Sequence, residues 1–185
     1  MKKNKMSFET SFWTGLAEGN PFREVDAFFA FAYLDYYKQN LSEMVIYSRK
    51  TKVYKQDNPS DVFVLYTAFN FFLKVCYGLQ KKSKKWKVKD SLCCETVFHL
   101  TSLTQEEYEN PFIVFQKAFG ENTLEEFELF LCQIVELSLS PHAGDPDAEL
   151  TTPYIHLIKM LDAGELIRER GVEKIRKTDQ MDPVA

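Results

Sequence analysis

Residues 62–79 read VFVLYTAFNFFLKVCYGL, an apolar run interrupted only by Asn70, Lys74 and small residues. Its large apolar residues recur in steps of three and four, which lays them along one stripe of an α-helix. The stripe comprises Val62, Leu65, Phe69, Phe72, Cys76 and Leu79. Phe63, Phe71 and Leu73 add apolar surface to the other faces. A helix that is apolar on nearly all sides is packed by several neighbours, so the run predicts the central helix of a bundle.

The same run is nearly long enough to span a bilayer, and the lysine-rich KKSKKWKVK that follows would suit a cytoplasmic flank. Against a membrane span, Asn70 and Lys74 lie inside the run, and a lysine near the centre of a membrane helix costs about 2.5–3.5 kcal/mol. Other aromatic-rich helices of the chain offer this run a simpler environment. We therefore expect a buried core helix and no membrane partner.

The composition predicts one folded, cytoplasmic domain. The chain has 185 residues, of which 45% are hydrophobic and 15% aromatic, enough for a core that needs no disulfide or metal. The start, MKKNKMSFETSFWTGLAEG, lacks the continuous apolar region of a signal peptide. The four cysteines, Cys76, Cys93, Cys94 and Cys132, form no CxxC pair, which favours free thiols in a reducing compartment.

Asparagine or threonine precedes proline at four places, and each place introduces an apolar segment. These dipeptides are Asn20-Pro21, Asn58-Pro59, Asn110-Pro111 and Thr152-Pro153. Proline pushes the preceding residue into the extended conformation of an N-cap, and its missing N–H costs nothing at the first helical position. We expect the Asn or Thr oxygen to cap each helix. The pattern predicts helix starts near Pro21, Pro59, Pro111 and Pro153.

Two of these starts read Asn-Pro-Phe, a tripeptide known as a short peptide-ligand motif. A docking role requires Phe22 and Phe112 to be exposed in turns. Because both head apolar, helix-compatible runs, we expect them to be the first core contacts of two helices instead.

Two capping boxes predict further helix starts. Thr104 with Glu107 predicts a single turn before the restart at Pro111, and Thr123 with Glu126 opens a longer amphipathic helix. The residues expected on its inner face are Leu124, Phe127, Leu131, Ile134 and Leu137.

The remaining segments complete an all-α prediction. We expect the first helix to run from Pro21 into the high forties and a short helix to form at residues 90–100. In the last helix we expect Ile155, Ile158 and Leu161 to face inward and Gly164 to kink or end it. Residues 165–177 are expected to continue this helix or to restart one.

KWKVK, residues 85–89, alternates too briefly to build a sheet. The sequence thus predicts a single-domain helical bundle of about five to seven helices over residues 1–185, with main starts near Pro21, Pro59, Pro111, Thr123 and Pro153. Residues 1–19 and 178–185 are expected to be flexible ends.

The lysine-rich segment is the candidate interaction surface. Its residues are Lys81, Lys82, Lys84, Lys85, Trp86, Lys87 and Lys89. Such a run attracts phosphates or acidic groups, and an exposed indole stacks on a base, although many charge runs are simply solvated linkers. Lysine lacks the planar fork with which arginine reads bases, so the attraction is diffuse.

Familiar catalytic signatures are missing from the chain. It contains no GxGxxG, GxxxxGK[ST], GxSxG or HExxH, so we predict no catalytic, cofactor or metal residues. The nearest thing to a site is the loop of residues 142–149, whose donors are His142, Asp145, Asp147 and Glu149. Pro146 stiffens its middle, which favours an acidic solvated loop over a cation site. His99 and His156 are expected to be ordinary, partly buried imidazoles.

We therefore expect a cytoplasmic helical protein that acts through protein–protein contacts, as an adaptor, a regulator or a small homo-oligomer. The alternative is a nucleic-acid-associated regulator that uses residues 81–89. Between Thr104 and Leu150 the acids are many and Lys117 is the only lysine or arginine, so that region would repel a polyanion.

Overall fold

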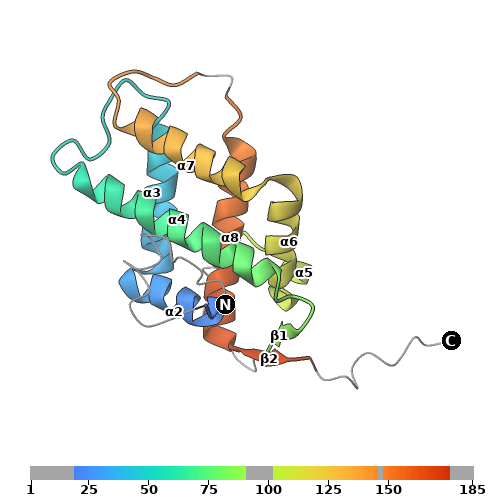
Figure 1. Ribbon diagram of the computed structural model, residues 1–185. Helices are drawn as coiled ribbons and strands as arrows, with labels where there is room; N and C mark the ends of the chain where they lie inside the picture. The colour runs from blue at the N-terminus through green and yellow to red at the C-terminus, as the bar shows by residue number, and fades with distance from the viewer. Residues whose placement is uncertain (1–18, 91–101, 146–147, 176–185) are drawn as a thin grey trace, which may run out of the picture.

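The computed structural model describes residues 19–90, 102–145 and 148–175, which hold seven helices and a two-stranded sheet (Figure 1). The helices are α2 (Pro21–Phe31), α3 (Leu34–Tyr47), α4 (Ser60–Gln80), α5 (Gln105–Glu109), α6 (Phe112–Glu121), α7 (Leu124–Ser138) and α8 (Thr151–Arg170). The strands are β1 (Trp86–Val88) and β2 (Val172–Lys174). The predicted all-α helical bundle is confirmed.

Helix α4 lies at the centre of the described bundle. Figure 1 shows it crossing in front of α3 and α8, and it packs against α2, α6 and α7. Every residue of its predicted stripe, from Val62 to Leu79, is buried. Although α4 is long and apolar enough to cross a membrane, 61% of its most apolar window is buried inside the molecule. Its environment is therefore that of a core helix, as predicted.

The crossing of α4 and α8 depends on Gly164. The helix continues through this residue to Arg170, so the predicted end at Gly164 is wrong. A Cβ placed there would lie 3.2 Å from the Phe72 ring and 3.3 Å from the Phe29 ring. The glycine therefore allows two aromatic side chains to pack directly on the backbone of α8.

The predicted first helix is two helices. It breaks at Ala32, which is extended, and α3 turns back so that the Tyr37 ring stacks on Phe28 at 4.0 Å between ring centroids. The Tyr37 hydroxyl donates to the Phe28 carbonyl at 2.8 Å, satisfying an acceptor in the last turn of α2. No proline or glycine lies at this break. The contact between Tyr37 and Phe28 favours it instead.

The helices begin near the predicted prolines, but only some of the predicted capping residues cap them. Asn20 caps α2 by accepting from the Phe22 amide at 3.2 Å, and both capping boxes form. Pro59 and Pro111 themselves occupy the N-cap positions in helical geometry, so Asn58 and Asn110 do not cap as predicted.

Helix α8 begins at Thr151, two residues before Pro153. Thr152 therefore lies inside the helix and is not its cap. The Glu149 carboxylate accepts from the amides of Thr151 and Thr152, at 2.8 and 2.9 Å. A carboxylate at a helix N-terminus also faces the positive end of the helix dipole, so Glu149 is a favourable cap.

The two Asn-Pro-Phe phenylalanines meet each other in the folded chain. Their rings lie 6.4 Å apart in perpendicular orientation, Phe112 is buried, and Phe22 packs partly buried against the core. Helix α2 starts at Pro21 and α6 at Phe112. The interpretation as helix starts is confirmed, and neither phenylalanine is presented as a docking signal.

The two-stranded sheet corrects the prediction that KWKVK would form no strand. Trp86 pairs with Lys174 and Val88 with Val172 in antiparallel register. Helix α8 ends at Arg170, and Gly171 follows with φ of 68°. Residues 172–174 are extended, so the prediction of helix over residues 165–177 is correct only as far as Arg170. The short alternation in KWKVK does not predict a strand by itself. The strand forms because it pairs with residues 172–174, which are far away in the sequence.

Two further predictions concern single segments. Ile155 was expected to face inward but is exposed, whereas Leu161 is buried as predicted. The short helix predicted at residues 90–100 and the predicted flexible ends lie outside the described residues, apart from the boundary residues Asp90 and Gly19.

Candidate functional site

The predicted lysine-rich segment forms a turn and a strand directly after α4. We call it the basic surface, defined by Lys81, Lys82, Lys84, Lys85, Trp86, Lys87 and Lys89. All its lysines are exposed except Lys82, which is half-buried. The turn is held by amide-to-carbonyl bonds from Lys82 to Leu79 and from Lys85 to Lys82, both 2.9 Å. Cations at a helix C-terminus face the negative end of its dipole, so the lysines are favourably placed.

Trp86 does not extend freely into solvent. It is half-buried and packs against the core, with its ring centroid 5.0 Å from that of Phe22. The Lys174 ammonium lies 5.6 Å from the centroid of the indole, across the two-stranded sheet. The indole therefore anchors the turn to α2, and the expectation of an exposed stacking platform is not supported.

A pocket of about 550 Å³ opens beside this turn. Its lining residues are Gly19, Pro21, Glu24, Gly78, Lys81, Lys82, Lys85 and Trp86. We call it the basic pocket. The fold thus gathers three lysines and the indole around one hollow, and leaves Lys84, Lys87 and Lys89 outside its lining. Lys87 lies instead 3.5 Å from Glu173 of the neighbouring strand.

Among the described residues that line the basic pocket, Glu24 is the one carboxylate. Burial raises the pKa of Glu24, and a backbone hydrogen bond from Gly19 opposes that rise. Three ammonium groups around one carboxylate leave the pocket with a positive balance. The pocket is therefore suited to an anionic group.

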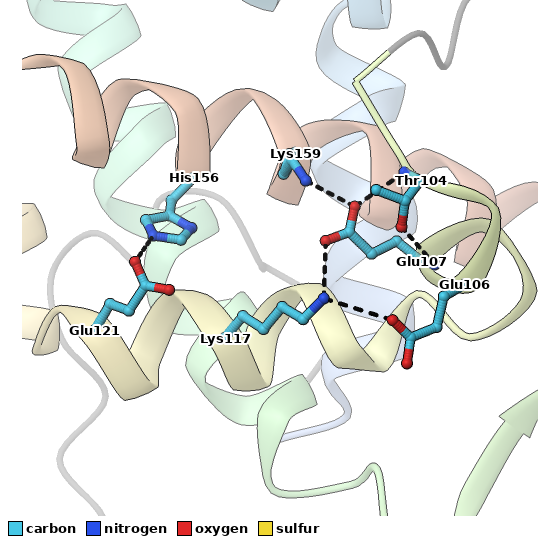
Figure 2. Close-up of polar contacts among 7 residues, drawn as sticks. All are labelled: Thr104, Glu106, Glu107, Lys117, Glu121, His156 and Lys159. Carbon is cyan, nitrogen blue, oxygen red and sulfur yellow. Dashed lines mark hydrogen bonds and ion pairs between the residues drawn. The ribbon is translucent and has the colours of Figure 1, made fainter.

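A second site, which sequence reasoning missed, lies between α5, α6 and α8 (Figure 2). We call it the polar pocket; it has a volume of about 360 Å³. Its lining residues are Thr104, Glu107, Val114, Lys117, Glu121, Thr152, Ile155, His156 and Lys159. Thr152, His156 and Lys159 share one face of α8 by their spacing, and Lys117 and Glu121 share one face of α6. No local pattern indicates that these two faces meet.

Glu107 is the buried centre of the polar pocket, with 2% of its surface exposed. Its carboxylate accepts from Lys159 Nζ at 2.7 Å, from Lys117 Nζ at 3.4 Å and from the Thr104 amide at 3.0 Å. Burial alone would raise the pKa of Glu107. The hydrogen bonds from Lys159 and Thr104 and the two lysine charges together outweigh burial and lower that pKa below its usual value.

His156 forms the other end of the polar pocket. Its Nε2 lies 2.9 Å from Glu121 Oε2, and its ring meets Phe127 edge-on at 6.2 Å between centroids. In Figure 2 its second ring nitrogen points away from Glu121, toward the space between Lys117 and Lys159. His156 is partly buried as predicted, but it belongs to a cluster of charged groups.

The acidic loop at residues 142–149 is tied to the ends of helices. Glu149 caps α8, while the Arg49 guanidinium donates to the carbonyls of Asp145 and Ala148. His142 is exposed, and Asp147 lies outside the described residues. Within the described part of the chain, no group of three or more His, Cys, Asp or Glu side chains is arranged to hold a metal ion.

Comparison with known proteins found no matching family, no similar curated protein and no similar solved structure.

Proposed function

We propose that this protein acts through protein–protein contacts and that its basic surface binds an acidic segment of a partner protein. The observation that carries the proposal is the convergence of Lys81, Lys82 and Lys85 around a pocket. A solvated linker would leave these lysines dispersed, whereas here a hydrogen-bonded turn, a strand pairing and the Trp86–Phe22 contact hold the backbone that carries them against the core. A backbone that is already ordered loses less conformational entropy on binding than a mobile segment does.

The chemistry of the surface favours a carboxylate-rich peptide over nucleic acid. Lysines attract anions without the bidentate geometry that reads base edges. Trp86 is half-buried and contacts Phe22, so it offers less free ring surface for stacking on successive bases than an exposed indole would. Pro21 and Trp86 supply apolar lining next to the lysines, which suits an acidic side chain flanked by an apolar one.

The charges elsewhere on the molecule support the same preference. Exposed acids on α7, among them Glu125, Glu126 and Glu136, would repel a long polyanion that extended across the bundle. A short acidic segment would contact the basic surface alone. The net formal charge of the chain is −4, which also argues against general nucleic-acid binding.

Fluorescence anisotropy with a labelled polyglutamate peptide and a single-stranded oligonucleotide of equal charge tests the proposal. We expect the peptide to bind more tightly than the oligonucleotide at the same salt concentration. The double variant K81Q/K85Q should weaken peptide binding about tenfold, because two exposed charge contacts are lost.

The matched control is K50Q/K52Q, which removes two exposed lysines from another part of the surface. It should bind the peptide like the wild type. Equal loss in both double variants would show that only net charge matters, and tighter binding of the oligonucleotide would support the nucleic-acid alternative. Either result overturns the proposal.

A further inference from the structure

We propose that the polar pocket between α5, α6 and α8 binds a small oxyanion, such as a carboxylate or a phosphate group carried by a small molecule. This site shares no lining residue with the basic pocket, so the inference stands apart from the proposed function. Its volume of about 360 Å³ exceeds that of a bare anion and falls within the range of small-ligand sites.

The two lysine ammonium groups of the polar pocket carry more N–H donors than Glu107 can accept, although Glu107 and Glu121 balance the two lysine charges of the lining. Lys117 and Lys159 carry three N–H donors each, and Glu107 is their shared acceptor. Glu107 already accepts from the Thr104 amide as well. The ammonium groups therefore retain donors that the Glu107 carboxylate cannot satisfy, and a ligand oxygen would be a suitable acceptor.

Lys117 is the cation best placed to turn toward a ligand. Its ammonium lies 3.4 Å from Glu107 and 3.7 Å from Glu106, both longer than the 2.7 Å contact of Lys159, and about half of its side chain is exposed. A loose ion pair at the surface is worth little, so Lys117 reorients at small cost. Lys159, held tightly from the opposite helix, is the fixed side of the site.

His156 supplies a third contact from the far end. With Nε2 occupied by Glu121, its other nitrogen faces the space between the two lysines (Figure 2). A protonated imidazole can donate from that nitrogen to an anion while it also donates to Glu121. Val114 and Ile155 supply apolar lining for the remainder of a small organic ligand, and Ile155 is exposed.

NMR of the histidine ring CH groups tests this proposal with defined probes. The probes are inorganic phosphate, phenyl phosphate and benzoate, with ethylammonium as a cationic control and constant ionic strength throughout. We expect a saturable shift of the His156 resonances with an anion in the range of about 1–10 mM. The exposed His142 is the internal reference, and its resonances should not show this saturable shift. Stronger binding of phenyl phosphate or of benzoate identifies the preferred oxyanion.

Substitution of Lys117 separates binding from structure. K117Q should lower the affinity for the anion about tenfold, which corresponds to the loss of one charged hydrogen bond. K117R should restore most of that affinity. The basic-surface variant K81Q/K85Q should bind the anion like the wild type. A His156 shift that does not saturate, an equal response to ethylammonium, or unchanged affinity in K117Q would overturn the proposal.

Discussion

Glu107 shows how a single residue serves two purposes in this fold. Its backbone and carboxylate complete the capping box of α5, and the same carboxylate joins α6 and α8 through Lys117 and Lys159. A buried carboxylate is costly unless its charge is paired and its oxygens accept hydrogen bonds. Three donors from three segments meet that requirement, so Glu107 fixes a five-residue helix that is too short to be stable alone.

The variant E107Q should lower the free energy of unfolding by about 1–3 kcal/mol at pH 7, because the lysines lose their charged acceptor. The pKa of Glu107 is lowered in the folded protein, so its stabilisation is present above the unfolded-state pKa. It disappears as the pH falls through the folded-state pKa. The difference between E107Q and wild type should therefore shrink in acid, as urea unfolding at pH 7 and at about pH 4 will measure.

The control for this prediction is the neighbouring Glu106, whose side chain is 69% exposed and lies 3.7 Å from Lys117. E106Q should change the free energy of unfolding by less than about 0.5 kcal/mol at either pH. If E107Q and E106Q behave alike, or if the deficit of E107Q grows in acid, the assignment of Glu107 as a paired, stabilising carboxylate is wrong.

At the scale of the element, the structure separates two kinds of helix start that look similar in sequence. Thr123 accepts from the Glu126 amide at 3.2 Å, and the Glu126 carboxylate accepts from the Thr123 amide at 2.6 Å. Asn110 precedes a proline that itself occupies the N-cap position of α6. We expect T123A to cost about 1 kcal/mol of stability and N110A less than about 0.5 kcal/mol. Urea midpoints of the two variants give the comparison. A larger loss of stability in N110A would show that Asn110 caps α6 after all.

The elements that the sequence predicted correctly are those with local causes. The stripe of α4 follows from helical periodicity, and the boxes at Thr104 and Thr123 follow from side chains three residues apart. The break between α2 and α3 arises from Tyr37 packing on Phe28, and the sheet pairs Trp86 with Lys174. The two strands are far apart in the sequence, so no short window contains both. Tyr37 and Phe28 are only nine positions apart, but helical periodicity does not show that the chain turns between them.

The two candidate sites differ in the same way. The lysines of the basic surface lie close together in the sequence, so the sequence alone identifies the segment. The polar pocket assembles side chains from three helices, and Glu107 and Lys159 are 52 positions apart. The sequence shows that the lining residues share one face of α6 and one face of α8. Only the packing of the two helices brings these faces together.

At the scale of the whole molecule, the aromatic core links elements that are distant along the chain. The Phe72 ring of α4 stacks on Phe28 of α2 at 4.4 Å and lies against Gly164 of α8. The same helix packs on α6 and α7. If α4 is the shared centre, the described helices should unfold together, as the predicted single domain requires.

The variant F72A should lower the free energy of unfolding by about 3–5 kcal/mol, because it leaves a cavity where three helices meet. Hydrogen exchange should then show protection falling by similar amounts in α2, α4, α6, α7 and α8. The matched control is F63A in the same helix, whose side chain is 62% exposed, and it should change stability by less than about 0.5 kcal/mol. Loss of protection in α2 and α8 with α6 and α7 unchanged would reveal two separately folding units. Because α4 contacts α2 as well as α6 and α7, we expect F72A to lower the protection of all of these helices.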